Sequence, residues 1–362
     1  MNRVPAALAS RQYDVLVGRH CLGALGAALW ARAPGGQVVV CCDEHVAPLY
    51  LEQARAGLLA AGYAVSHVVV PAGERQKSLA RAEELYGVLY DRGVRRSDTL
   101  LALGGGVIGD LVGYVAATFQ RGVRFAQVPT TLLAQVDAAI GGKVAVDFRA
   151  GKNYVGTFYQ PWLVFADLTT LDTLPERELR SGAAEVAKYA LLCGGEMLER
   201  TERLAGAAFG ASRVSQALVA SCARYKISVV ARDEREVTGH RAVLNLGHTL
   251  GHAIEAATGF SRFSHGEAVA LGLRAALWLS RRLCGLPAAH EARGLALLDG
   301  FGLPSRLTGV AANDIAALTK RDKKAGREGV GYVLLDALGA PRVDVRVPPE
   351  LEVEVSRWLT TP

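Results

Sequence analysis

The chain has 362 residues, of which 50% are hydrophobic and 21% are charged, so it can bury sizeable cores and is not intrinsically disordered. Its net charge of +6 suits an anionic small molecule, and the lack of a lysine- and arginine-rich run argues against a nucleic-acid-binding arm. The sequence has neither a signal-like N-terminus nor an apolar run long enough for a membrane span, and its six cysteines lack Cys-x-x-Cys spacing. These features predict a cytoplasmic protein with reduced thiols and with no nucleic-acid or membrane partner.

The first half of the chain alternates strand-like and helical segments. Residues 12–18, 37–43 and 64–70 have strand patterns, and residues 37–43 form the continuous apolar run typical of a parallel strand that is buried on both faces. Ala- and Leu-rich helical segments at 22–33 and 48–61 separate these strands. This alternation predicts an α/β domain with a doubly wound, mostly parallel sheet, in which ligands bind at the carboxyl ends of the strands.

Polar or glycine residues lie at the ends of two predicted strands. Asp43 ends one strand, where a carboxylate can contact ribose hydroxyls or cap the next helix. A buried strand from Leu100 leads into three glycines at 104–106 and then into a helix. The backbone N–H groups of such a turn can hold a phosphate, although glycines also occur there for packing alone. Asp110, one turn into that helix, could contact a ribose or interact with the helix dipole.

Two lysines beside glycines follow the predicted strand at 125–128. Lys143 comes after Gly141-Gly, and Lys152 comes after Gly151, so we expect both cations to lie on tight turns. They could form an anion-binding site or be solvated loop lysines.

The second half is mainly helical, with a predicted boundary near residues 173–178. Glu185 and Lys188 are three residues apart on one helix face, and their small apolar neighbours indicate a buried pair rather than a surface ion pair. His248 and His252 share one face of a predicted helix at 246–257, which fits either a metal or proton-transfer site or two buried structural histidines. His265 lies at a predicted helix N-terminus, a position suited to a ligand.

Taken together, eight ordered motifs resemble those of the 3-dehydroquinate synthases, within the wider sugar-phosphate cyclase family. The resemblance extends from about Asp43 to Lys324. The motifs are Gly104-Gly-Gly-x-x-Gly-Asp110, Pro129-Thr-Thr-Leu-Leu-Ala-x-Val-Asp137, Gly141-Gly-Lys143, Gly151-Lys-Asn153, Ala184-Glu-Val-x-Lys188, Leu244-Asn-x-Gly-His-Thr-x-Gly-His252, His265-Gly-Glu267 and Asp322-Lys-Lys324.

The resemblance implies an NAD-binding α/β domain over residues 1–175 and a mainly α-helical domain over residues 176–362 that binds zinc and substrate. The implied zinc ligands, which also accept Co²⁺, are Glu185, His248 and His265. His252 is then not a ligand, and the implied proton-transfer residues are His252 and Glu236. The implied NAD contacts are Asp43, Glu74, Lys77, Gly104, Gly105, Gly106, Asp110, Thr130, Thr131, Lys143 and Lys152.

The implied substrate is 3-deoxy-D-arabino-heptulosonate 7-phosphate, bound between the domains. The implied substrate contacts are Arg121, Asp137, Lys143, Lys152, Asn153, Lys188, Lys226, Arg241, Asn245, His252 and Lys324. A partner subunit of a homodimer would supply Arg121. The implied catalytic residues are His252, Glu236, Lys143, Lys188, Arg241 and Asn245.

The implied reaction yields 3-dehydroquinate and phosphate in the shikimate pathway of aromatic amino acid biosynthesis. It combines transient oxidation by NAD, phosphate elimination, reduction, ring opening and an intramolecular aldol closure. Many family members have serines at the positions of Ala138 and Ala139 and threonine at that of Val144, which leaves amino-dehydroquinate, inosose or valiolone synthases as alternatives. A metal-dependent polyol dehydrogenase and a catalytically inactive binding protein are further alternatives.

Overall fold

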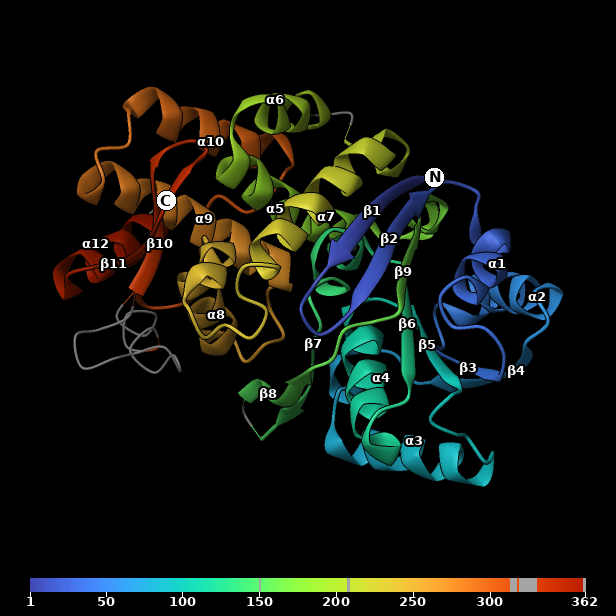
Figure 1. Ribbon diagram of the computed structural model, residues 1–362. Helices are drawn as coiled ribbons and strands as arrows, with labels where there is room; N and C mark the ends of the chain where they lie inside the picture. The colour runs from blue at the N-terminus through green and yellow to red at the C-terminus, as the bar shows by residue number, and fades with distance from the viewer. Residues whose placement is uncertain (150, 207–208, 313–317, 319–330, 361–362) are drawn as a thin grey trace. The chain divides into compact units, whose positions relative to one another are not determined.

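The computed structural model in Figure 1 describes residues 1–149, 151–206, 209–312, 318 and 331–360. Contacts between residues divide the chain into two compact units. The first unit contains residues 1–174 and 214–235, and the second contains residues 175–213 and 236–362. Among the described residues, no helix is both long and apolar enough to cross a membrane.

The first unit is built on a seven-stranded sheet with the order β1-β2-β9-β6-β5-β3-β4. Only the β1–β2 pair is antiparallel, so the structure confirms the expected mostly parallel sheet. The strands of this unit are β1 (Asn2–Ala7), β2 (Gln12–Gly18), β3 (Gln37–Asp43), β4 (Ala64–Val70), β5 (Thr99–Gly104), β6 (Arg124–Pro129), β7 (Lys143–Phe148), β8 (Gly151–Phe158) and β9 (Leu163–Asp167). Its helices are α1 (Leu25–Trp30), α2 (Glu52–Ala60), α3 (Leu79–Asp91), α4 (Gly106–Thr118) and α7 (Gln216–Val230).

Apolar side chains cover both faces of this sheet. In β3, Val38, Val40 and Cys42 belong to one core, which also contains residues of α1 and α2. Val39 and Cys41, which point to the opposite face, belong to a second core with residues of α3 and α4. The continuous apolar run of this strand thus results from burial on both sides, as the sequence predicts.

Helix α7 corrects the predicted domain division, which assigned all residues after 175 to the helical domain. The structure groups residues 214–235 with the first unit, because α7 contacts β1, β2 and the short helix η5 (Ala134–Ala138). Its inward face carries buried apolar residues, including Leu218, Val219 and Cys222. In the sequence, α7 lies between helical segments of the second unit, and no local pattern indicates that it packs on the first unit instead.

The second unit is mainly helical, with one small antiparallel sheet. Its helices are α5 (Glu176–Cys193), α6 (Gly195–Leu204), α8 (His248–Ala257), α9 (His265–Leu283), α10 (Ala288–Gly300) and α12 (Pro349–Thr360), and its strands are β10 (Gly331–Ala337) and β11 (Ala340–Arg346). Helix α9 lies at its centre, because α5, α8, α10, α12 and β10 all contact it.

Glycines allow backbone segments to approach α9 very closely. A Cβ atom on Gly272 would lie 1.8 Å from the carbonyl oxygen of Gly247, and one on Gly266 would lie 1.9 Å from that of Ser181. Gly247 also has a φ of 79° at the start of α8, which favours glycine. These two approaches bring the start of α8 and the N-terminal half of α5 against α9.

We expect Gly272→Ala to destabilise the protein, because the added methyl group would overlap a backbone carbonyl that cannot move without shifting α8. Overpacking of this kind costs about 1–3 kcal/mol. Denaturant unfolding measures the change. The control is Gly87→Ala in the interior of α3, where nothing lies within 4 Å of an added Cβ, and which should be neutral or stabilising by up to about 1 kcal/mol. Equal stability of the two variants would contradict the close-approach argument.

Candidate functional site

Three residues from three helices of the second unit converge on one point. Glu185 lies in the middle of α5, whereas His248 and His265 are the first residues of α8 and α9. The Glu185 Oε1 atom is 3.4 Å from His248 Nε2 and 3.5 Å from His265 Nε2. One ligand atom from each residue lies within 4.8 Å of the others, so this group could hold a metal ion.

The start of each helix fixes its histidine in place. Helix α9 begins with a capping box, in which the Ser264 hydroxyl accepts a hydrogen bond from Glu267 N and the Glu267 carboxylate accepts one from Ser264 N. Arg177 donates two hydrogen bonds to the same carboxylate. Helix α8 begins after Gly247, which packs closely on α9 at Gly272, and the His248 ring centroid is 5.5 Å from that of His265.

The Glu185 carboxylate is buried and has an ion pair with Lys188, one helical turn away on α5. Each side chain is only 1% exposed, so the pair is buried as predicted. Among the described residues, neither carboxylate oxygen accepts a hydrogen bond of normal geometry. A buried carboxylate whose oxygens accept no such hydrogen bond, together with the two imidazoles that face it, forms a suitable set of ligands for a divalent cation such as Zn²⁺.

The pKa shifts of these three residues differ in direction. Burial opposes ionisation of Glu185, but Lys188 and His248 outweigh it and hold the pKa of Glu185 well below its usual value. Burial and the Lys188 cation lower the pKa of His248. Burial also disfavours a charged His265, but contacts with the carboxylates of Glu185 and Glu255 prevail and raise its pKa to about 10. At neutral pH and without a metal ion, His265 is therefore charged and His248 is neutral.

The structure places the two histidines of α8 in different groups. The His252 ring is 5.4 Å from the His248 ring, at an angle of 89°, but His252 is not part of the group around Glu185. It forms a second cluster with Glu255 and His265. The structure thus separates the two histidines of the His-x-x-x-His pair, and which of them binds a metal ion stays a prediction.

Other predicted residues of the second unit lie just before α8. The short helix η8 (His240–Asn245) contains both Arg241, which is buried, and Asn245. Glu236 lies upstream with a φ of 55°, in the left-handed region. The predicted substrate contact Lys324 lies outside the described residues.

The glycine turn of the first unit joins β5 to α4. Strand β5 ends at Gly104 and α4 begins at Gly106, and the N-cap residue, Gly105, has no side chain with which to cap this helix. A Cβ atom on Gly104 would lie 2.8 Å from Ile108, and one on Gly105 would lie 3.0 Å from Thr131. The glycines thus serve packing, and Gly105 offers no side chain to cap the helix. A phosphate-binding role for this turn stays a prediction.

Two predicted NAD contacts have local hydrogen-bonding roles. Asp43 Oδ1 accepts hydrogen bonds from the backbone N–H groups of His45 and Val46, both at 2.9 Å. Thr131 Oγ1 accepts one from Ala134 N at 3.2 Å. Thr130, the adjacent predicted contact, is buried. A ligand role for these side chains remains a prediction.

Lys77, which is buried, is the centre of a cluster of charged side chains near this turn. Its Nζ atom lies 2.9 Å from Glu74 Oε1, 3.5 Å from Asp110 Oδ2 and 3.8 Å from Asp147 Oδ1. Burial lowers the pKa of Lys77, but the three carboxylates outweigh it and raise that pKa. Burial raises the pKa of Asp110 to about 6 despite the nearby lysine. Three of these residues are predicted NAD contacts, and the structure brings them together.

Strands β7 and β8 form an antiparallel hairpin that the sequence did not predict. Lys143 begins β7 and Lys152 lies in β8, so the expectation of two lysines on tight turns is wrong. Asn153 has a φ of 54°, and its backbone N–H donates to Asp147 Oδ1 at 2.7 Å. Asp147 was also missed, although the buried alternation of Val144 and Val146 before it is a strand signal.

The remaining predicted substrate contacts of the first unit lie on short helices and in α7. Lys226 Nζ is 2.9 Å from Asp137 Oδ2 and donates to the Asp137 carbonyl at 2.8 Å, which joins α7 to η5. Arg121 ends the short helix η4 (Phe119–Arg121) with a φ of 61°. The substituted positions Ala139 and Val144 are buried at 1% and 2% exposure.

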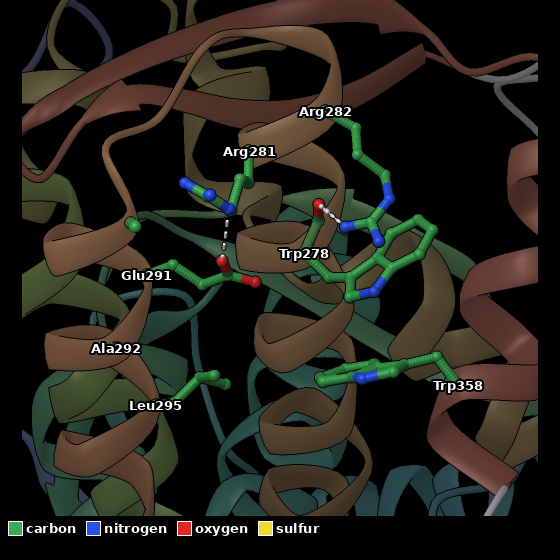
Figure 2. A pocket seen from close by; sticks show the side chains of 8 residues that line it. Trp278, Arg281, Arg282, Glu291, Ala292, Leu295 and Trp358 are labelled. Atoms are coloured by element: carbon green, nitrogen blue, oxygen red, sulfur yellow. Dashed lines mark hydrogen bonds and ion pairs between the residues drawn. The ribbon is translucent and has the colours of Figure 1, made fainter.

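A separate surface pocket of the second unit contains none of the predicted site residues. Figure 2 shows Trp278 and Trp358 with Arg281 and Arg282 around this pocket, which has a volume of about 400 Å³. Arg281 forms an ion pair with Glu291 at 3.2 Å, and the Arg282 guanidinium lies over the Trp278 ring. The metal-binding geometry therefore lies elsewhere, at the starts of α8 and α9.

Comparison with known proteins identifies the family. Residues 67–181 match the family model described as 3-dehydroquinate synthase N-terminal, and residues 182–325 match the model described as 3-dehydroquinate synthase C-terminal. A 3-dehydroquinate synthase from Nitrobacter hamburgensis is 45% identical over 356 residues, which cover 96% of this chain and 93% of the relative. The chain belongs to the 3-dehydroquinate synthase family. The resemblance inferred from the motifs is confirmed.

Solved cyclase structures share the fold of this 3-dehydroquinate synthase family member. A 2-deoxy-scyllo-inosose synthase complexed with carbaglucose-6-phosphate, NAD⁺ and Co²⁺ has a TM-score of 0.89 and 27% identity, covering 99% of this chain and 100% of that chain. A 2-epi-5-epi-valiolone synthase from Streptomyces hygroscopicus subsp. jinggangensis with NAD⁺ and Zn²⁺ bound has a TM-score of 0.86 and 27% identity, covering 97% of both chains.

The opposite pKa shifts of the two histidines predict how many protons leave when a metal ion binds. His265 must lose its proton, whereas His248 and Glu185 are already deprotonated, so Zn²⁺ binding near neutral pH should release about one proton per ion. The apparent affinity should fall roughly tenfold for each unit of lower pH. Titration of the metal-free protein in weak buffer with an indicator dye measures the release. Affinity that does not depend on pH, with no proton released, would contradict this assignment.

Proposed function

We propose that the chain is a 3-dehydroquinate synthase, which converts 3-deoxy-D-arabino-heptulosonate 7-phosphate to 3-dehydroquinate and phosphate. The observation that carries the proposal is the convergence of Glu185, His248 and His265 in a chain that matches both family models. The enzyme would be a carbon–oxygen lyase of the shikimate pathway. We further propose that it acts in the cytoplasm as a homodimer, in which the partner's copy of Arg121 completes the phosphate site.

The residues around Glu185 fit a Zn²⁺ or Co²⁺ ion. One buried carboxylate, whose oxygens accept no hydrogen bond of normal geometry among the described residues, and two imidazole Nε2 atoms converge there. Such an ion supplies Lewis acidity, which makes a bound hydroxyl easier to deprotonate and to oxidise. In this proposal Glu185, His248 and His265 hold the ion and leave positions for substrate oxygens. Lys188 keeps the Glu185 carboxylate ionised and contributes a cation for the substrate.

NAD supplies a hydride acceptor that regains its oxidised form within one turnover, so it acts catalytically. The uncapped start of α4 would bind its diphosphate through backbone N–H groups. The cluster of Glu74, Lys77 and Asp110 would contact its polar groups, and Lys77 holds those two carboxylates in place. The other proposed contacts are Asp43, Gly104, Gly105, Gly106, Thr130, Thr131, Lys143 and Lys152.

The basic residues of the hairpin would bind the phosphate that the reaction eliminates. Lys143, Lys152 and Asn153 lie on β7 and β8, and Asp147 orders the backbone at Asn153. Cations beside the leaving phosphate stabilise its developing charge. The proton leaves from the carbon next to the transient ketone, and the phosphate itself can accept it.

The remaining polar residues would hold the sugar acid and move protons during reduction, ring opening and aldol closure. We assign proton transfer to His252 and Glu236. The proposed contacts to substrate carboxylate and hydroxyl groups are Asp137, Lys188, Lys226, Arg241, Asn245 and Lys324.

A related cyclase of secondary metabolism is the second candidate. It is favoured by the loss of hydroxyl groups at Ala138, Ala139 and Val144. The structure weakens this argument, because Val144 is buried in the core with Phe125 and would present little surface to a ligand. The first candidate is supported by 45% identity to a relative of that name, against 27% for the inosose and valiolone synthases. A polyol dehydrogenase would consume NAD stoichiometrically.

One assay separates these functions. Purified protein receives the heptulosonate phosphate, trace NAD⁺ and Zn²⁺ or Co²⁺, and released phosphate is measured. We expect many turnovers per NAD⁺ with no net accumulation of NADH, because the hydride returns to the product. Phosphate release only from amino or hexose analogues would select a related cyclase. Stoichiometric NADH production from polyols would select the dehydrogenase.

Substitution of the two α8 histidines tests their separate roles. We expect His248→Ala to lose bound metal and activity, because it removes a proposed ligand. We expect His252→Ala to retain metal but to turn over more slowly, by about 10²–10⁴-fold if it acts as a general acid or base. Metal analysis of the purified variants and the phosphate assay provide the measurements. Equal metal loss in both variants would restore the two-ligand interpretation of the His-x-x-x-His pair.

A further inference from the structure

The two ring nitrogens of His265 face two different carboxylates. Nε2 lies 3.5 Å from Glu185 Oε1, at the proposed metal site, and Nδ1 lies 3.4 Å from Glu255 Oε2. A carboxylate accepts hydrogen bonds, so Nδ1 can donate its proton to Glu255 also when Nε2, which faces Glu185, carries no proton. Glu255 is a residue for which the proposed mechanism has no use.

His248 shows the same arrangement with a different acceptor. Its Nε2 lies 3.4 Å from Glu185 Oε1, and its Nδ1 lies 3.1 Å from the carbonyl oxygen of Leu246. Histidines that bind metals usually donate their other N–H to a carboxylate or backbone carbonyl, which fixes the tautomer and the ring orientation. In this chain the Nδ1 atom of His248 faces a backbone carbonyl, and that of His265 faces the carboxylate of Glu255.

Glu255 is buried, so its carboxylate needs a partner such as His265. Glu255 is 3% exposed, and a buried carboxylate is costly unless it is paired. It lies seven residues after His248 on α8, that is, two turns along the same helix face. Helix α8 therefore carries one of the proposed ligands and also the acid that faces the other proposed ligand on α9.

We propose that Glu255 is a positioning residue, whose carboxylate holds His265 in the tautomer and orientation that present Nε2 to the metal ion. This inference deepens the proposed function, since it rests on the metal site of that function. It also explains the second cluster of His252, Glu255 and His265 without a second ion, because the contact to His265 Nδ1 belongs to the support of the first site.

The experiment measures metal binding without substrate or NAD. Metal-free wild-type protein, E255Q and E255A are titrated with Co²⁺ against a competing chelator, and the visible absorption spectrum of the bound ion is recorded. The matched control is E352Q. Glu352 is a similarly buried acid (5% exposed) of the same unit, and it accepts a hydrogen bond from the Tyr332 hydroxyl. Thermal unfolding of each metal-free variant reports on the fold.

We expect wild type to bind one Co²⁺ per chain. E255A should bind it about 10–100-fold more weakly, with a changed absorption spectrum. E255Q should lose less affinity, because its amide oxygen can still accept from Nδ1, and this partial rescue would not follow from a merely structural role. E352Q should keep the affinity and spectrum of wild type.

Two outcomes would overturn the inference. Equal affinity and spectrum for wild type and E255A would show that Glu255 does not act on the metal site. Two bound ions in wild type, with one lost in E255A, would make Glu255 a direct ligand of a second site. The proposed function fails separately: Co²⁺ binding that depends on Glu255, in a protein that releases no phosphate from the heptulosonate phosphate, would disprove the activity but not the positioning role.

Discussion

The buried charge of Glu185 is a strong constraint on the packing of the second unit. A carboxylate that is 1% exposed in the middle of a helix would be strongly destabilising without compensation. Lys188 provides one cation from the same helix, and His265 provides another from α9 when it is protonated. Helix α9 must therefore meet α5 at this carboxylate, and His248 brings α8 to the same point.

Glycine makes the meeting sterically feasible. The contacts of Gly272 with Gly247, and of Gly266 with Ser181, are closer than any side chain allows. They pack the start of α8 on the middle of α9 and the start of α9 on α5. Both histidines stand at helix starts, and their ring centroids are 5.5 Å apart. The cap at a helix start fixes the direction of the backbone, and the capping box at Ser264 therefore fixes the backbone position of His265. Precise ligand placement thus follows from backbone contacts rather than from long side chains.

Sequence patterns correctly predicted the features that depend on neighbouring residues in the chain. The buried β3 strand follows from its apolar run, and the inward-facing Glu185–Lys188 pair follows from its small apolar neighbours. The β7–β8 hairpin was missed because glycines beside Lys143 and Lys152 favoured turns over strands, despite the alternation at Val144 and Val146. The place of α7 could not be predicted, because its partners β1, β2 and η5 are distant in sequence. The contact of Glu255 with His265 likewise needs the three-dimensional arrangement.

The charges around Glu185 also suggest why this arrangement suits an oxidation of a hydroxyl group. Without a metal ion, the carboxylates of Glu185 and Glu255 are balanced by Lys188 and a protonated His265. Exchange of that single proton for a divalent cation would leave one excess positive charge beside the buried Glu185 carboxylate. An ionised hydroxyl of the substrate would neutralise it, and poor screening in a buried site strengthens that attraction. The same pairing that keeps the metal-free helices together would then favour the deprotonated form of the substrate once the ion is bound.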